Sequence, residues 1–383
     1  MTQTYTPRGM IEALVAIPTV SRDSNLVCID FIREYLSAHG IESHLVRNED
    51  GSKASLFATV GPMVADGVVL SGHTDVVPID DQDWQTDPFT VTERDGRLFG
   101  RGTCDMKSFY AIALALVPEM GKLKRPIHFA LSYDEEVGCL GAPALIDALT
   151  AAVPKPEAVI VGEPTSMRVV NAHKSIFHFV TRITGHEAHS SQPHRGVSAV
   201  MVAGRLINWI HERQQKNARA PSNSAFEPPY ASLHCGMIRG GTATNIMAHH
   251  CEFVTDIRAL PGEDARRYFD EYRKFAKNVV EPEMQAIAPD TGIEFEINAE
   301  VPAFQSAQDC PAVALARRLT GQNAVEAVSY GAEAGQFQNA GHSVVMCGPG
   351  SIDQAHQPNE FITLDQVEEG TAFMRRLIDH LSS

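Results

Sequence analysis

The sequence predicts an α/β fold in which an open, mostly parallel-sheet domain with helices on both faces is interrupted by an inserted α+β domain with an antiparallel sheet. The chain has 383 residues, more than one ordinary core accommodates, so two domains are expected. In the first third, short apolar runs alternate with helical patterns. Near residue 176 the pattern changes to alternating strands and amphipathic helices, and the first pattern returns after about residue 300.

The elements of the first pattern follow from hydrophobic spacing. Residues 25–38 carry apolar side chains at helical spacing, and residues 108–120 predict a second helix. Runs of Val, Ile and Leu at 68–70, 127–131 and 158–161 are bounded by polar residues or glycine, as buried strands are. Strands that alternate with helices in this way are typical of a parallel sheet.

The middle of the chain predicts the inserted domain. Residues 176–185, 251–260 and 292–301 alternate as half-exposed strands do, while 196–214 and 263–280 predict amphipathic helices. The apolar side of the first of these helices is expected to carry Val197, Val200, Met201, Ile207 and Ile210. The polar, proline-containing residues 214–230 predict a loop. We place the outer domain in residues 1–176 and 300–383 and the inserted domain in residues 177–299.

Composition narrows the functional classes. A net charge of −15 argues against a nucleic-acid binder and against a polybasic membrane-surface protein. The seven cysteines are scattered and form no Cys-x-x-Cys pair, which predicts unpaired thiols in a reducing compartment. The first residues lack an apolar signal region, and no unbroken apolar span reaches about 18 residues. A cytoplasmic protein with no membrane role is therefore expected.

Ligand-type residues follow the predicted strands. The segments after the strands, before the helix at 108–120 and late in the chain contribute His73, Asp75, Asp105, Asp134, Glu135, Glu136, Glu163 and His356. In an open α/β sheet, sites form where the carboxyl ends of the strands meet, so these side chains can converge. Histidine with carboxylates is the ligand set of a hydrolytic divalent-metal site.

Two metals fit this set of donors. Each metal would take one histidine and one terminal carboxylate, with an aspartate shared between them, and two His, two Glu and one Asp fill that scheme. Two ions about 3.5–4 Å apart can clamp a water and polarise a carbonyl together, and one remaining carboxylate can act as a general base. Asp75 follows His73 by two residues on the same face, so its carboxylate is expected to accept a hydrogen bond from the second ring nitrogen.

Several motifs carry a resemblance to a known family. The segments SGHTDVVP, GRGTCDMKS, SYDEEVGCLGA, VGEPTS, GHEAHSSQPHRGVSA, GGTATNI, GAEAGQF and GPGSIDQAHQPNEF occur in this order and cover most of the chain. Together they resemble the dinuclear-zinc amidohydrolases and peptidases, which include acetylornithine deacetylases, succinyl-diaminopimelate desuccinylases, aminoacylases and glutamate carboxypeptidases. Among these, the acetylornithine deacetylases are the most similar.

The resemblance implies a distribution of the metal ligands. His73 and Glu163 would hold one ion, Glu136 and His356 the other, and Asp105 would bridge them. Zinc is the expected metal, with cobalt or manganese as alternatives. Residues 1–176 and 300–383 would then form the catalytic, metal-binding domain.

The resemblance also implies roles for other residues. Glu135 would be the general base for attack by a metal-bridging hydroxide, and a cis peptide bond is expected between Asp105 and Met106. In the inserted domain, His189 would reach the active site of the partner subunit and stabilise the tetrahedral oxyanion. Asn245 and Arg258 would bind the end of the substrate, since a guanidinium forms a bidentate pair with a carboxylate. The inserted domain would act as a lid and as the interface of a homodimer.

The implied reaction is hydrolysis of N2-acetyl-L-ornithine, a small N-acyl amino acid, to L-ornithine and acetate for arginine biosynthesis. Ser108, Ser175, Ala248 and Ala332 depart from residues that are common in close relatives. Other substrates therefore remain open, namely another N-acyl amino acid, succinyl-diaminopimelate or a dipeptide. A non-catalytic metal-binding module is a further alternative, although Glu135 and the five ligand positions are all present.

Overall fold

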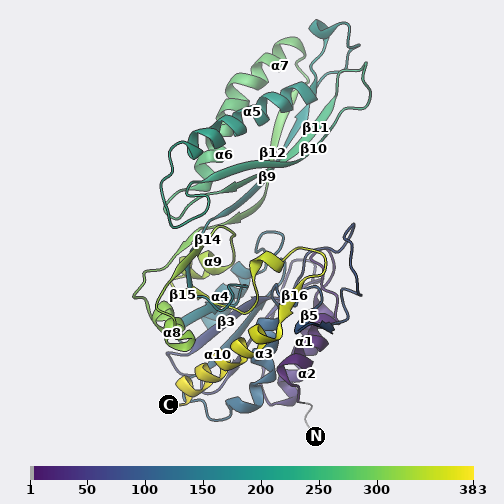
Figure 1. The fold of residues 1–383 in the computed structure, drawn as a ribbon. Helices are drawn as coiled ribbons and strands as arrows, with labels where there is room; N and C mark the ends of the chain where they lie inside the picture. The colour runs from purple at the N-terminus through teal and green to yellow at the C-terminus, as the bar shows by residue number, and fades with distance from the viewer. Residues whose placement is uncertain (1–3) are drawn as a thin grey trace. The chain divides into compact units, whose positions relative to one another are not determined.

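The computed structural model describes residues 4–383 and divides into two compact units. The first unit contains residues 4–172, 304–326 and 332–383, and the second contains residues 173–303 and 327–331. The first is built on a mixed, mostly parallel sheet, and the inserted second unit is built on a four-stranded antiparallel sheet (Figure 1). The predicted fold class is therefore confirmed.

The first unit is organised around a nine-stranded sheet. Its strands are β1 (Ser43–Arg47), β2 (Ala54–Val60), β3 (Val68–His73), β6 (Ile127–Ser132), β7 (Ala158–Val161), β8 (Val170–His173), β13 (Phe304–Gln305), β14 (Glu326–Val328) and β15 (Val344–Met346). The order is β1-β2-β6-β3-β7-β15-β8-β13, with β14 paired to β8. Strands β6, β3, β7 and β15 form the parallel centre, and β1, β2 and β8 join antiparallel.

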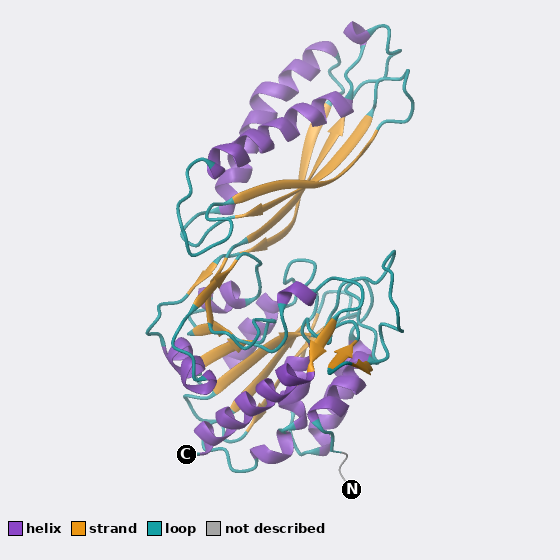
Figure 2. Cartoon of the chain, in the orientation of Figure 1, coloured by secondary structure: helices purple, strands orange, loops and turns teal. Residues whose placement is uncertain are grey.

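Helices cover both faces of this sheet (Figure 2). They are α1 (Pro7–Val15), α2 (Leu26–Ala38), α3 (Lys107–Ala115), α4 (Ala142–Ala152), α8 (Pro311–Thr320), α9 (Ala334–Asn339) and α10 (Leu364–Ser382). Val68 and Leu70 of β3 join the main core with side chains of α1, α3 and α10, whereas Val69 is buried on the opposite face, where α4 and α9 pack together. The predicted helix at 108–120 ends at Ala115, because Pro118 interrupts the hydrogen-bonding ladder and starts a 3-10 turn at Val117–Met120.

A small antiparallel sheet completes the first unit. It consists of β4 (Thr92–Arg94), β5 (Arg97–Phe99) and β16 (Phe361–Thr363) in the order β16-β5-β4. Short 3-10 turns lie at Ile352–Gln354 in this unit and at Pro193–Arg195 in the second unit. Within residues 4–383, no helix combines the length and the apolar character that crossing a membrane requires.

The second unit is a sheet covered by helices on one face (Figure 2). Strands β9 (Ile176–Thr184), β10 (Ser232–Gly240), β11 (His250–Arg258) and β12 (Gly292–Val301) pair antiparallel in the order β10-β11-β9-β12. Helices α5 (Ala199–Ala218), α6 (Ala265–Phe275) and α7 (Glu281–Ile287) pack on it, with a π turn at Ala276–Val280 between the last two. Leu206, Phe179 and Tyr272 lie in the shared core.

Two predictions in this unit were wrong in detail. Helix α5 begins after the N-cap Ser198 and continues to Ala218, so it extends into the predicted loop and stops before Pro221. The side of α5 that is buried carries Ala199, Ala203, Leu206 and Ile210. Val200 and Met201, which were expected on the buried side, are 38% and 76% exposed. They directly follow Ala199 in the sequence, so the turn of the helix carries their side chains away from the buried stripe.

Candidate metal centre

The fold brings the ends of three parallel strands to one edge of the sheet. Strand β3 ends at His73, β6 leads into Glu135 and Glu136, and β7 leads into Glu163. Because β6, β3 and β7 are neighbours and run parallel, their carboxyl ends face the same space. Asp105 enters this space from the turn that precedes α3. The predicted convergence is thus a consequence of strand order.

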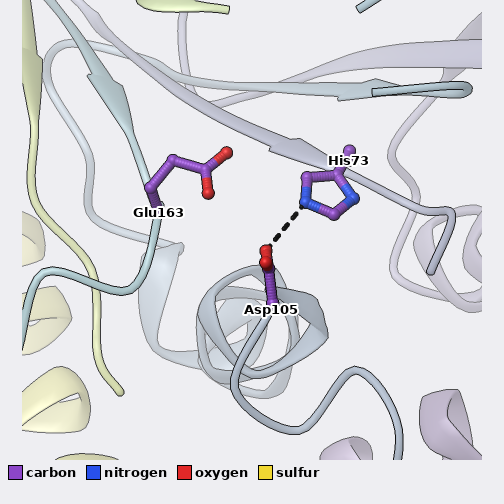
Figure 3. A group of neighbouring side chains, drawn as sticks. All are labelled: His73, Asp105 and Glu163. Atoms are coloured by element: carbon purple, nitrogen blue, oxygen red, sulfur yellow. Dashed lines mark hydrogen bonds and ion pairs between the residues drawn. The ribbon is translucent and has the colours of Figure 1, made fainter. Parts of the chain in front are cut away.

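The structure forms two donor groups that share Asp105. The first consists of His73, Asp105 and Glu163, and the second of Asp105, Glu136 and His356, with the donor atoms of each group within 4.8 Å of one another. His73 Nε2 lies 3.1 Å from Asp105 Oδ1, and the three side chains of the first group point toward a common space (Figure 3). His356 Nε2 lies 2.9 Å from Glu136 Oε2 and 3.3 Å from Asp105 Oδ2. The two oxygens of Asp105 therefore face different groups.

The donor atoms fit a pair of cations. Oε1 of Glu136 and Oε1 of Glu163 are buried and have no hydrogen-bond partner among residues 4–383. A buried carboxylate oxygen without a partner is costly, and a coordinated cation supplies the missing partner. The three ligand carboxylates and the neighbouring Glu135 would together carry four negative charges, which two divalent ions balance.

The pKa shifts of the donor residues also fit bound cations. Burial, together with the Asp105 and Glu135 carboxylates, holds the pKa of Glu163 well above its usual range. Hydrogen bonds with Asp105 and Glu136 outweigh partial burial and raise the pKa of His356 to about 11. Burial is the largest cause for Glu163 and the carboxylate partners are the largest for His356, and nearby negative charge favours the protonated form of both. Bound cations would displace those protons.

Glu135 is a buried carboxyl group that lies outside both donor groups. Burial raises its pKa to about 8, with further contributions from the Glu136 and Asp105 carboxylates and an opposing one from His73. The thiol of Cys139, four residues later in the same turn, donates a hydrogen bond of 3.1 Å to Glu135 Oε1. A carboxyl group with a pKa near neutrality can both accept and release a proton at working pH.

Asp75 makes different contacts from those expected. His73 Nδ1 hydrogen-bonds at 2.9 Å with the main-chain oxygen of Asp75, while the Asp75 carboxylate lies 3.6 Å from that nitrogen. That carboxylate accepts hydrogen bonds from Ser21 Oγ at 2.7 Å and from the main-chain N–H groups of Glu135 and Glu136 at 3.1 and 3.3 Å. Asp75 thus contacts His73 Nδ1 through its main-chain oxygen at 2.9 Å and through its carboxylate as an ion pair at 3.6 Å, and the same carboxylate holds the Glu135–Glu136 segment.

The remaining predicted residues lie in the second unit. His189 and Asn245 are exposed and lie on adjoining segments, since His189 bridges Ile246 and Ser190 N donates to Asn245 O at 3.0 Å. Arg258, at the end of β11, pairs with Asp256 at 2.9 Å. The structure groups His189 with Asn245 and separates both from Arg258 along the sheet.

Some neighbours of the site were not identified from the sequence. Cys139, Arg101, Glu333 and Glu360 are all buried around the ligand segments. Cys139 and Glu360 stand within the motifs SYDEEVGCLGA and HQPNEF, but a motif does not show which of its polar residues turn inward. The expected cis peptide bond between Asp105 and Met106 is confirmed.

Comparison with known proteins agrees with this geometry. The model of Peptidase family M20/M25/M40 matches residues 69–380. Acetylornithine deacetylase of Photorhabdus laumondii is 34% identical over 380 residues, covering 97% of this chain and 96% of that protein. Acetylornithine deacetylase of Pasteurella multocida is 32% identical over 381 residues, covering 96% of each.

A solved structure shows the same fold. The M20 family metallo-carboxypeptidase Sso-CP2 from Sulfolobus solfataricus superimposes with a TM-score of 0.80 at 15% identity, covering 99% of this chain and 100% of that chain. The family match and the relatives of more than 30% identity both span most of the sequence. The chain therefore belongs to the M20/M25/M40 peptidase family, and it is a metal-dependent amide hydrolase of that family.

Proposed function

We propose that this enzyme removes the acetyl group of N2-acetyl-L-ornithine, giving L-ornithine and acetate for arginine biosynthesis. The observation that carries the proposal is the pair of donor groups sharing Asp105, beside the buried carboxyl group of Glu135. The relatives of 34% and 32% identity are named acetylornithine deacetylase, which supports this substrate. The seven cysteines are free thiols, which agrees with a reaction in the cytoplasm.

The ligand set favours zinc, with cobalt or manganese as alternatives. We assign one ion to His73, Asp105 and Glu163 and the other to Asp105, Glu136 and His356. Bound there, two divalent ions would polarise the acyl carbonyl and allow water to attack it at neutral pH. The main-chain oxygen of Asp75 fixes Nδ1 of His73 as the protonated nitrogen, which leaves Nε2 as the donor atom.

Glu135 is the proposed general base. Its Oε1 accepts the hydrogen bond from Cys139, so we assign Oε2 to proton transfer. Glu135 would take a proton from the attacking water and later pass it to the nitrogen of the leaving amine. The Asp75 carboxylate accepts hydrogen bonds from the main-chain N–H groups of both Glu135 and Glu136. These bonds fix the position of the proposed base, Glu135, relative to the ligand Glu136.

The geometry of the second unit supports a dimeric active site. Asn245 and His189 lie beyond the start of β11, near His250, whereas Arg258 lies at its end. Eight residue steps of about 3.3 Å separate His250 from Arg258, so the two ends lie roughly 26 Å apart. An amino-acid substrate is too short to touch both ends within one copy. We therefore assign Arg258 to the substrate carboxylate in one subunit and His189 and Asn245 to the site of its partner.

The second unit also presents a surface suited to a second copy of the chain. Strand β10 is an edge of its sheet, and Met237 and Ile238 on it are 54% and 52% exposed. Helix α5, which contacts β10, exposes Val200 and Met201. Exposed apolar side chains beside an open strand edge favour pairing with an identical edge, as in a two-fold homodimer.

Acetate release tests the proposed reaction. N2-acetyl-L-ornithine is incubated with the enzyme before and after metal removal by a chelator. We expect activity to disappear with the metal and to return when zinc is added. Full activity in the metal-stripped enzyme would contradict the proposal.

A second substrate class has support from the chain itself. Ser175, one of the departures from the relatives, accepts a hydrogen bond of 2.9 Å from Ala259 N, directly beside Arg258. A different residue at position 175 would therefore change the backbone contact beside Arg258, the residue that we assign to the substrate carboxylate. Rates on acetylated, succinylated and dipeptide substrates at saturating zinc separate these activities, and hydrolysis of any of them excludes a non-catalytic metal-binding module.

A further inference from the structure

Glu360 is a buried carboxylate that lies between the segment carrying Asp105 and the segment carrying His356, which meet in the metal centre. It is 1% exposed and lies four residues after His356. Its oxygens accept hydrogen bonds from the main-chain N–H groups of Gly102 at 3.1 Å, Cys104 at 2.8 Å and Asp105 at 3.0 Å. Gly102 has a φ of +84°, the left-handed conformation that turns these N–H groups toward one point. The carboxylate therefore fixes the backbone from which Asp105 projects.

Arg101 extends these contacts to the segment that carries His356. Its guanidinium is 1% exposed and donates to Glu360 Oε2 at 2.7 Å. The second terminal nitrogen donates to Gln82 Oε1, and Gln82 Nε2 donates to the main-chain oxygen of His356 at 3.1 Å. The ring of Trp84 covers the guanidinium, 5.0 Å from its centre. One connected network thus reaches the backbones of both Asp105 and His356.

We propose that Glu360 is a positioning residue for both metal ions, an inference that rests on the metal centre of the proposed function. Asp105 belongs to both donor groups, so a displacement of its backbone changes both sites at once. A neutral amide at position 360 would turn an N–H group toward main-chain N–H groups and leave Arg101 without a counter-charge. Residues that orient metal ligands typically change metal affinity by about 10–100-fold when they are replaced.

Metal retention tests this directly, without substrate. The full-length zinc-loaded enzyme and its Glu360→Gln variant are dialysed against graded chelator concentrations, and the remaining zinc is measured. We expect both zinc ions to be held about 10–100-fold more weakly in the variant. Glu360→Asp keeps the charge but is one methylene shorter, so it should lose less affinity and serves as the test if Glu360→Gln does not fold.

A matched control removes a different Arg–Glu pair of the same unit. Arg125 and Glu157 pair at 2.9 Å just before β6 and β7, at the sheet edge opposite the ligands. Glu157→Gln should therefore leave zinc retention unchanged. With cobalt in place of zinc, the absorption spectrum reports ligand geometry, and we expect it to change with Glu360→Gln and to stay constant with Glu157→Gln.

The outcomes distinguish a failure of the Glu360 positioning role from a failure of the metal centre itself. The positioning role would be overturned if folded Glu360→Gln or Glu360→Asp keeps wild-type zinc affinity and an unchanged cobalt spectrum and shows only a lower thermal stability. Retention of zinc by the wild type and weakened retention by the Glu360 variants supports it. A wild-type enzyme that binds no zinc under any condition would instead refute the metal centre itself.

Discussion

Replacement of Glu135 by glutamine is expected to stabilise the metal-free enzyme while it removes activity. In the metal-free fold, burial raises the pKa of Glu135 from 4.5 to about 8. The folded chain then keeps a proton that the unfolded chain releases, so stability falls as pH rises through the window between 4.5 and about 8. At pH 7 the penalty is roughly 3 kcal/mol, from two to three pKa units at about 1.4 kcal/mol each.

Glutamine removes this penalty with little change in shape. It keeps an Oε1 that can accept the hydrogen bond from Cys139, but it has no proton to lose. The metal-free variant should therefore melt several degrees higher than the metal-free wild type at pH 7–8, and the difference should vanish near pH 4.5. Turnover of the zinc-loaded variant should fall on the order of 10²–10⁴-fold, because the proton acceptor is lost.

The assay combines calorimetry with metal analysis. Melting temperatures of metal-free and zinc-loaded forms are recorded between pH 4.5 and 8, and zinc content is measured before and after dialysis. In the zinc-loaded forms the stability difference should shrink, because bound cations stabilise the ionised carboxylate. Equal pH dependence in both metal-free proteins would refute the buried-carboxyl reasoning. Loss of both zinc ions from the variant would show that Glu135 is a ligand and not the base.

Other substitutions test separate parts of the structure. Glu163→Gln should lose one zinc ion and Asp105→Asn both, since the first residue belongs to one donor group and the second to both; elemental analysis after dialysis decides this. Arg258→Gln should raise KM for N2-acetyl-L-ornithine at least tenfold, because a charge-assisted pair with the substrate carboxylate is lost, and an unchanged KM argues against that contact. Met201→Glu should shift the enzyme toward monomers in sedimentation, whereas Val27→Glu on α2 in the other unit should not, although Val27 is 68% exposed and Met201 76%. The same Met201→Glu variant should lose activity at low protein concentration if His189 acts across the dimer, and an active monomer would contradict that role.

Much of the fold could be predicted because its signals are local. Apolar runs bounded by polar residues marked β3, β6 and β7, and their alternation with helices indicated a parallel sheet. Signals that depend on context were weaker. Strand β10 was not predicted, since its exposed edge carries a mixed sequence with Gly236, and its register shifts between Cys235 and Met237.

The buried side of α5 shows a related limit. Hydrophobic residues occur on more than one side of this helix. The sequence alone places Val200 and Met201 on the side expected to face the core, because both are large and apolar. The tertiary structure buries the stripe of Ala199, Ala203 and Leu206, whose small residues allow close approach to the sheet. Val200 and Met201 remain exposed on another side of the helix.

The sequence by itself determined which histidines and carboxylates follow the strands and which family the chain resembles, because residue types and strand-end positions are properties of short segments. The resemblance already implied two donor groups that share Asp105, and the structure brings their atoms together. The tertiary structure alone decided that the Asp75 carboxylate holds the Glu135–Glu136 backbone and that Glu360 links the segments that carry Asp105 and His356. Those relations depend on strand order and on which polar side chains are buried. Both follow from packing between residues that are far apart in the chain, which no local pattern records.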